Sequence, residues 1–109
     1  MTATAVITGG GTAGHVLPAL AIADALVAAG HPASSIHYVG TRRGVEARML
    51  PDTQYGHTLL DISGLQRSFS VSAIRRNAAL PLRLVRSLRA ARRLLRELRP
   101  GVVVNVGGY

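Results

Sequence analysis

The sequence predicts an α/β fold, a doubly wound parallel sheet, from three observations. Short apolar runs alternate along the chain with longer segments that have helical periodicity. The first run, residues 4–8, lacks the polar alternation of a half-exposed strand, which is typical of a parallel strand covered on both faces. Glycine-rich turns follow the first and the last apolar runs. In such sheets ligands bind at the carboxyl ends of the strands, so both turns are candidate site elements.

The predicted elements follow one another in a regular order. Strands are expected over residues 4–8, 35–40, 55–62 and 102–106, and helices over residues 16–29, 45–50 and 82–98. Gly30 and Pro51 should end the first two helices, and Pro18 should be tolerated in the first turn of the first one. Residues 66–72 are expected to form a loop, and residues 73–80 a short helix broken at Pro81.

The last predicted helix is strongly amphipathic. Its apolar residues fall on one face at 100° per residue, and they are Leu84, Leu88, Ala91, Leu94, Leu95 and Leu98. Arginines spread around the opposite face. We therefore expect the leucine face to cover the sheet.

Composition limits the possible classes of protein. A chain of 109 residues forms one domain at most. All 13 basic residues behind its formal charge of +8 are arginine, because it has no lysine. A field of this sign attracts anions. The absence of cysteine excludes disulfides and thiolate metal sites, and no carboxylate cluster suggests a divalent cation, so no metal is expected. No segment is apolar enough for long enough to cross a bilayer.

The first glycine turn, residues 9–14, follows a strand and opens a helix. This arrangement presents free N–H groups and the positive end of a helix dipole to an anion. The residues proposed to hold a phosphate or diphosphate are Gly10, Gly11, Thr12, Ala13 and Gly14. The alternative is a tight turn whose glycines only let the helix pack on the strand.

The same turn satisfies the dinucleotide pattern G-x-G-x-x-G. The NAD version expects an acidic residue at the end of the second strand, where Arg42 and Arg43 follow instead. Two arginines suit the 2′-phosphate of NADP, so an NADP-binding oxidoreductase domain stays open. A Walker-type cradle is excluded because it needs a lysine.

Residues 10–20, GGTAGHVLPAL, resemble the first glycine loop of the MurG family of bacterial peptidoglycan glycosyltransferases. Further matches follow in the family's order at residues 39–41, 44–47, 62–65, 81–83, 99–100 and 107–109. Two departures are Ala13, where the family usually has glycine, and residues 66–70, which differ from the family's short basic segment.

The resemblance implies a chain with two Rossmann-like domains (the GT-B fold), of which residues 1–109 are part of the N-terminal, acceptor-binding domain. The C-terminal donor-binding domain would then be absent. The implied reaction, in cell-wall assembly, is inverting transfer of N-acetylglucosamine from UDP-N-acetylglucosamine. The acceptor is the 4-hydroxyl of undecaprenyl-diphosphate-linked N-acetylmuramyl-pentapeptide, and no cofactor is implied. The fragment alone would be inactive. A non-catalytic subunit that anchors at the membrane and binds the acceptor is the alternative.

The family match nominates His15 as the base near the acceptor hydroxyl, and Gly108 and Tyr109 as further residues of the same cleft. A histidine that only caps or packs the turn is the alternative reading. For Glu46 we expect a helix-start carboxylate beside Arg42 or Arg43 rather than a substrate contact.

Apolar residues rimmed by arginine suit the anionic surface of the inner membrane, so we expect peripheral attachment at its cytoplasmic face. The residues proposed for it are Phe69, Ile74, Arg75, Arg76, Leu82, Arg83, Val85, Arg86 and Arg89. A solvated surface helix is the alternative. One Phe and three Tyr offer little stacking surface, so no nucleic acid is expected as a partner.

Overall fold

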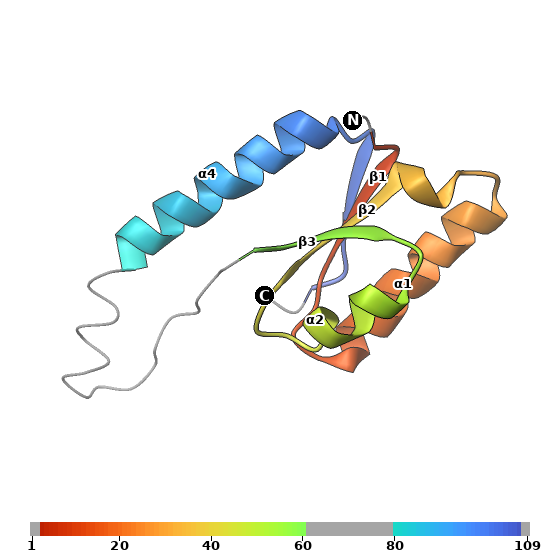
Figure 1. The fold of residues 1–109 in the computed structure, drawn as a ribbon, viewed down its shortest axis with the longest axis horizontal. Helices are drawn as coiled ribbons and strands as arrows, with labels where there is room; N and C mark the ends of the chain where they lie inside the picture. Colours follow the sequence, from red (N-terminus) through yellow and green to blue (C-terminus); the bar gives the residue numbers. More distant parts are fainter. Residues whose placement is uncertain (1–2, 61–79, 108–109) are drawn as a thin grey trace.

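The computed structural model describes residues 3–60 and 80–107, which form a parallel sheet with helices on both faces (Figure 1). The strands are β1 (Ala5–Thr8), β2 (Ile36–Thr41), β3 (Gly56–Leu60) and β4 (Val102–Asn105). The helices are α1 (Ala13–Ala28), α2 (Glu46–Met49) and α4 (Leu80–Leu98), with short 3-10 turns at η1 (Ala33–Ser35) and η2 (Leu50–Asp52). The strand order is β3-β2-β1-β4, all parallel. The predicted doubly wound α/β class is confirmed.

The strand order reverses at β1. From β1 the chain passes to β2 and β3 on one side and then returns to β4 on the other. Thr8, the last residue of β1, pairs with Val39 of β2 and Asn105 of β4. Ligands of open α/β sheets bind beyond the carboxyl ends of the strands at such a reversal. Both glycine turns start at this point.

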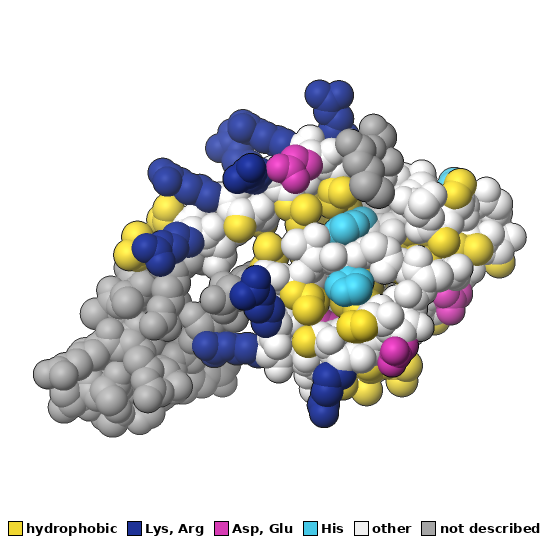
Figure 2. All heavy atoms as spheres, in the orientation of Figure 1, with side chains coloured by type: hydrophobic (Ala, Val, Ile, Leu, Met, Phe, Trp, Pro, Cys, Tyr) yellow, Lys and Arg dark blue, Asp and Glu magenta, His cyan; other side chains and the backbone are white. Residues whose placement is uncertain are grey.

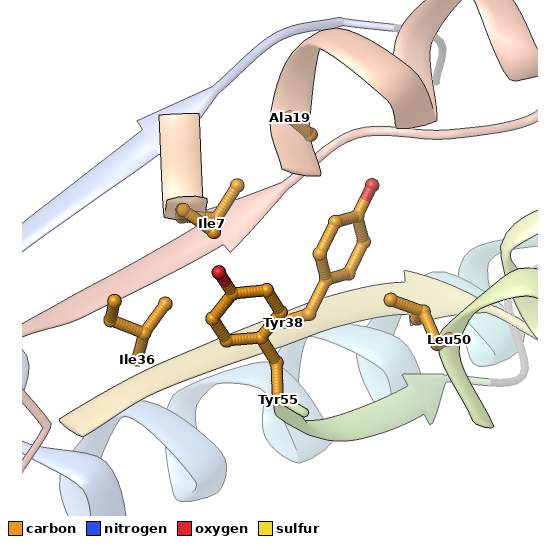
Figure 3. Packing of buried hydrophobic residues seen from close by; sticks show 7 residues of the cluster. Ile7, Ala19, Ile36, Tyr38, Leu50 and Tyr55 are labelled. Atoms are coloured by element: carbon orange, nitrogen blue, oxygen red, sulfur yellow. The ribbon is translucent and has the colours of Figure 1, made fainter. Parts of the chain in front are cut away.

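The main core lies between the sheet and helices α1 and α2 (Figure 3). Ile7 of β1, Ile36 and Tyr38 of β2, Ala19 of α1, Leu50 and Tyr55 are all buried there. The Tyr55 hydroxyl donates a hydrogen bond to Asp24 of α1, so the segment before β3 is tied to the first helix.

Helix α4 covers the other face of the sheet only near its C-terminal end (Figure 1). Leu98 is buried against Ala3 and Val6, whereas Leu88 is 60% exposed and Leu95 is 40% exposed. A groove of about 200 Å³ separates the helix from the sheet, and its lining residues are Val6, Thr8, Val39, Leu60, Ala91, Leu94, Leu95 and Val103. The expectation that the whole leucine face covers the sheet is therefore wrong. The short turn into β4 holds one end of the helix against the sheet, and the helix diverges from there.

Two helix starts differ from the prediction. Helix α1 begins at Ala13 rather than residue 16, so Pro18 lies inside the helix and cannot donate to the carbonyl of Gly14. Helix α4 begins at Leu80, so Pro81 lies in its first turn instead of breaking a helix. Proline is tolerated there because N–H groups of the first turn have no helical acceptor.

Of the two predicted helix ends, the one at Gly30 is confirmed and the one at Pro51 is wrong. Gly30 ends α1 as expected, with a φ of 108° and an N–H bond to the carbonyl of Val27. Pro51 does not end a helix, because the chain continues from Met49 into the 3-10 turn η2, which includes it. Residues 66–72 and 73–79, where a loop and a short helix were expected, lie outside the described residues.

Candidate functional site

The two glycine turns meet at the reversal of strand order. The N–H of Gly10 donates to the carbonyl of Gly107 at 3.1 Å. Gly9 has a φ of 143°, and a Cβ there would lie 2.3 Å from Cγ2 of Val106. Side chains rarely adopt this backbone conformation, and contact at 2.3 Å is impossible, so only glycine fits. Both turns were predicted to lie at the carboxyl ends of the strands, on one edge of the sheet. The structure brings them into contact there.

His15 lies where the two turns meet, as the third residue of α1. Its Nδ1 is 3.1 Å from the hydroxyl oxygen of Thr12. Its Cδ2–Nε2 edge faces Gly107, where an added Cβ would lie 3.9 Å from Nε2. Thr12 occupies the N-cap position, but its hydroxyl binds the imidazole instead of a helix amide. When Nδ1–H donates to Thr12, Nε2 carries the lone pair and can accept a proton.

The amides open to an anion are those of Thr12, Ala13 and Gly14. These residues are exposed, and within the described part of the chain their N–H groups donate to no other residue. They belong to the N-cap and first turn of a 16-residue helix, whose dipole favours negative charge at this end. Gly10 and Gly11 direct their N–H groups to Gly107 and Glu46 instead.

Glu46 begins α2, as expected, but its carboxylate is fully buried beneath the first glycine turn. Its Oε2 accepts from the N–H of Gly11 at 3.0 Å. Its Oε1 accepts from the N–H and the hydroxyl of Thr41, at 3.0 and 2.9 Å. Glu46 was expected to lie at a helix start beside Arg42 or Arg43. Its bonds to Gly11 and Thr41 add a link between the glycine turn and the end of β2, which was not predicted. A signal in the sequence was Gly44, whose missing side chain leaves room for this carboxylate.

Tyr38 also supports the first glycine turn and was not singled out from the sequence. Its hydroxyl donates to the carbonyl of Gly9. Burial raises the pKa of Tyr38 to about 12, and the nearby Glu46 carboxylate adds to this shift. The phenol therefore stays protonated and remains a donor. An aromatic residue in a buried strand is typical of a core residue. The sequence therefore carried no signal that the Tyr38 hydroxyl would support the glycine turn.

Asn105 fixes the second glycine turn. Its side-chain Oδ1 accepts from the N–H of Gly107 at 2.9 Å, and Gly107 has a φ of 94°. Asparagine two residues before a glycine is a recognisable signal for such a turn. Gly108 and Tyr109, which were expected to line the cleft, lie outside the described residues.

The residues proposed for membrane contact are described only in part. Leu82 and Val85 are 58% and 45% exposed on α4, and Arg86 and Arg89 are exposed beside them. Figure 2 shows arginines spaced along this helix with apolar side chains between them. Phe69, Ile74, Arg75, Arg76 and the side chain of Arg83 lie outside the described residues. Among the described helices, none has the length and apolar character needed to span a membrane.

Comparison with known proteins gives a consistent result. Residues 5–109 match the family model described as glycosyltransferase family 28 N-terminal domain. A curated relative from Lacticaseibacillus casei is 43% identical over 104 residues, and one from Stutzerimonas stutzeri is 43% identical over 109 residues. Both are named UDP-N-acetylglucosamine–N-acetylmuramyl-(pentapeptide) pyrophosphoryl-undecaprenol N-acetylglucosamine transferase. These matches span 95% and 100% of this chain but 27% and 29% of the relatives.

A solved structure agrees with the sequence relatives. The crystal structure of Acinetobacter baumannii MurG superimposes with a TM-score of 0.74 at 30% sequence identity. The match covers 96% of this chain and 29% of that one. The chain therefore spans little more than a quarter of the length of the proteins that it resembles.

Proposed function

The chain belongs to the glycosyltransferase family 28 N-terminal domains, and from that premise we propose that it works as part of a longer, two-domain glycosyltransferase. The proposed reaction is the one in its relatives' names, transfer of N-acetylglucosamine from UDP-N-acetylglucosamine to the undecaprenyl-diphosphate-linked muramyl pentapeptide. Residues 1–109 would supply part of the acceptor-binding domain. Membership of this family removes the grounds for an NADP-binding oxidoreductase.

The observation that carries the proposal is the meeting of the two glycine turns around His15. Nδ1 of His15 is occupied by Thr12, and Nε2 faces the turn at Gly107. In the proposed step the acceptor 4-hydroxyl attacks the anomeric carbon and gives its proton to Nε2. The bond to UDP breaks with inversion, and UDP leaves with the bonding electrons. The open amides of residues 12–14 would hold a diphosphate beside this centre.

A joined enzyme tests this role. Residues 1–109 would replace the matched N-terminal segment of the Stutzerimonas stutzeri relative, and transfer of labelled N-acetylglucosamine to the lipid-linked acceptor would be measured. Loss of a general base lowers the rate by about 10²–10⁴-fold, so His15→Asn should reduce kcat by this factor with little change in UDP-N-acetylglucosamine binding. His31→Asn, at an exposed position three residues beyond the C-terminal end of α1, is the matched control. Full activity of His15→Asn would remove the assignment.

We also propose that α4 attaches the enzyme to an anionic membrane surface on the cytoplasmic side. Leu82, Val85 and Leu88 are exposed, and Arg86 and Arg89 lie among them. Each cation near an anionic surface contributes about 1 kcal/mol, which is about a fivefold change in binding. Arg86→Glu should therefore weaken sedimentation with phosphatidylglycerol vesicles by more than fivefold. Arg48→Glu, the same charge change on α2, should do so much less, and equal effects would contradict this surface.

A further inference from the structure

We infer that Glu46 is a positioning residue for the first glycine turn, through the hydrogen bond from Gly11 to its Oε2; this inference rests on the proposed function. The two carboxylate oxygens serve different parts of the chain. Oε2 accepts from Gly11, 35 residues away, at 3.0 Å, whereas Oε1 accepts from the nearby N–H and hydroxyl of Thr41. One buried side chain thus links the glycine turn to the segment after β2.

Gly44 provides independent support for this link. A Cβ at Gly44 would lie 2.0 Å from Oε2 and 2.4 Å from Oε1 of Glu46. The φ of Gly44 lies outside the left-handed range, so its backbone does not itself require glycine. The missing side chain is needed because the carboxylate occupies that space.

The bond to Glu46 completes a set of three that fix successive glycines. Tyr38 holds the carbonyl of Gly9, Gly107 accepts from the N–H of Gly10, and Glu46 accepts from the N–H of Gly11. With these groups engaged, the first amide that can meet a ligand is that of Thr12. The buried negative charge under Gly11 also repels an anion there. Glu46 therefore directs a diphosphate toward the first turn of α1, beside His15.

The two oxygens allow a matched pair of variants in the joined enzyme. Glu46→Gln leaves a single acceptor oxygen, and the two donors of Thr41 favour that oxygen at the Oε1 position, so an NH2 group, which cannot accept, faces the N–H of Gly11. Thr41→Val removes one bond to Oε1 and leaves the bond from Gly11 to Oε2. Misplacement of a substrate-binding turn by about 1 Å costs up to about a hundredfold, so Glu46→Gln should lower kcat/KM by about tenfold to a hundredfold. Thr41→Val should lower it by less than threefold, and urea unfolding of both variants measures their stability.

A spectroscopic readout separates positioning from general stability. In protein labelled with ¹⁵N-glycine, the Gly11 amide signal should shift and exchange faster in Glu46→Gln but stay unchanged in Thr41→Val. If Glu46→Gln does not fold, Gly44→Ala takes its place, because it keeps the carboxylate and displaces it. Two results would overturn the inference. One is an equal loss of kcat/KM in Thr41→Val and in Glu46→Gln (or Gly44→Ala in its place), and the other is an unchanged Gly11 amide signal in Glu46→Gln or its replacement. An inactive joined enzyme with the unaltered residues 1–109 would instead refute the proposed function, while the Gly11 signal would still report on Glu46.

Discussion

Gly9→Ala tests whether the two glycine turns are held together as tightly as the geometry indicates. The new methyl group would lie 2.3 Å from Cγ2 of Val106 and 3.0 Å from the carbonyl oxygen of Gly107. The φ of 143° costs a residue with a side chain about 1–3 kcal/mol, and overpacking costs about another 1–3 kcal/mol. We expect the free energy of unfolding to fall by about 2–6 kcal/mol. Urea denaturation with linear extrapolation measures this difference.

Gly30→Ala separates the two contributions to that loss. Gly30 also has a positive φ, 108°, but no atom lies within 4 Å of the position of an added Cβ. This control should lose about 1–2 kcal/mol from backbone strain alone. Adding Val106→Ala to Gly9→Ala should recover about 1 kcal/mol, because it removes the clashing methyl group. A Gly9→Ala variant no less stable than Gly30→Ala would refute the close approach of the two turns.

Two further predictions concern stability. The pKa of Tyr38 is raised in the folded state from 10.0 to about 12, so its contribution is complete below pH 10 and is lost as the pH rises through 12. The unfolding free energy should fall by about 2 kcal/mol between pH 9 and pH 11.5. Unfolding measured at pH 9 and pH 11.5 checks this, and Tyr38→Phe should show a clearly smaller fall. Arg99, which follows α4, has a φ of 44°, so Arg99→Gly should raise the thermal midpoint through a gain of about 0.5–1 kcal/mol. Arg96→Gly inside α4 should lower it by a similar amount, and a change of the same sign in both would contradict the left-handed assignment.

Much of the fold followed from local patterns in the sequence. Alternating apolar runs and helical periods predicted the sheet, and the rule on the carboxyl ends of strands placed both glycine turns on one edge. The position of α4 could not be predicted in this way. Periodicity shows which face of a helix is apolar, but it carries no information on how far the helix lies from the sheet. Leu88 therefore fitted the pattern of a core residue and is 60% exposed.

The glycine turn and His15 of the candidate site were predicted from the sequence. The side chains that support the turn were not. Glycine spacing and the resemblance pointed to the turn and to His15. The roles of Tyr38 and Glu46 depend on contacts with residues 29 and 35 positions away, and nothing near them in sequence specifies those partners. Asn105 differs, because its partner is two residues away and its residue type is typical of such a turn.

Among the described strands of residues 1–109, β4 lies at one edge of the sheet, and this edge affects how this stretch of chain behaves in concentrated solution. Val102 and Val103 are each about half exposed, at 49% and 51%, and residues 102–105 include no charge and no proline. Such a strand is a template for pairing with another chain. The formal charge of +8 opposes association, because it keeps copies of the chain apart when little salt is present. Colloidal stability should therefore fall as salt is added, which makes dilute, low-salt buffer the condition for spectroscopy on this chain.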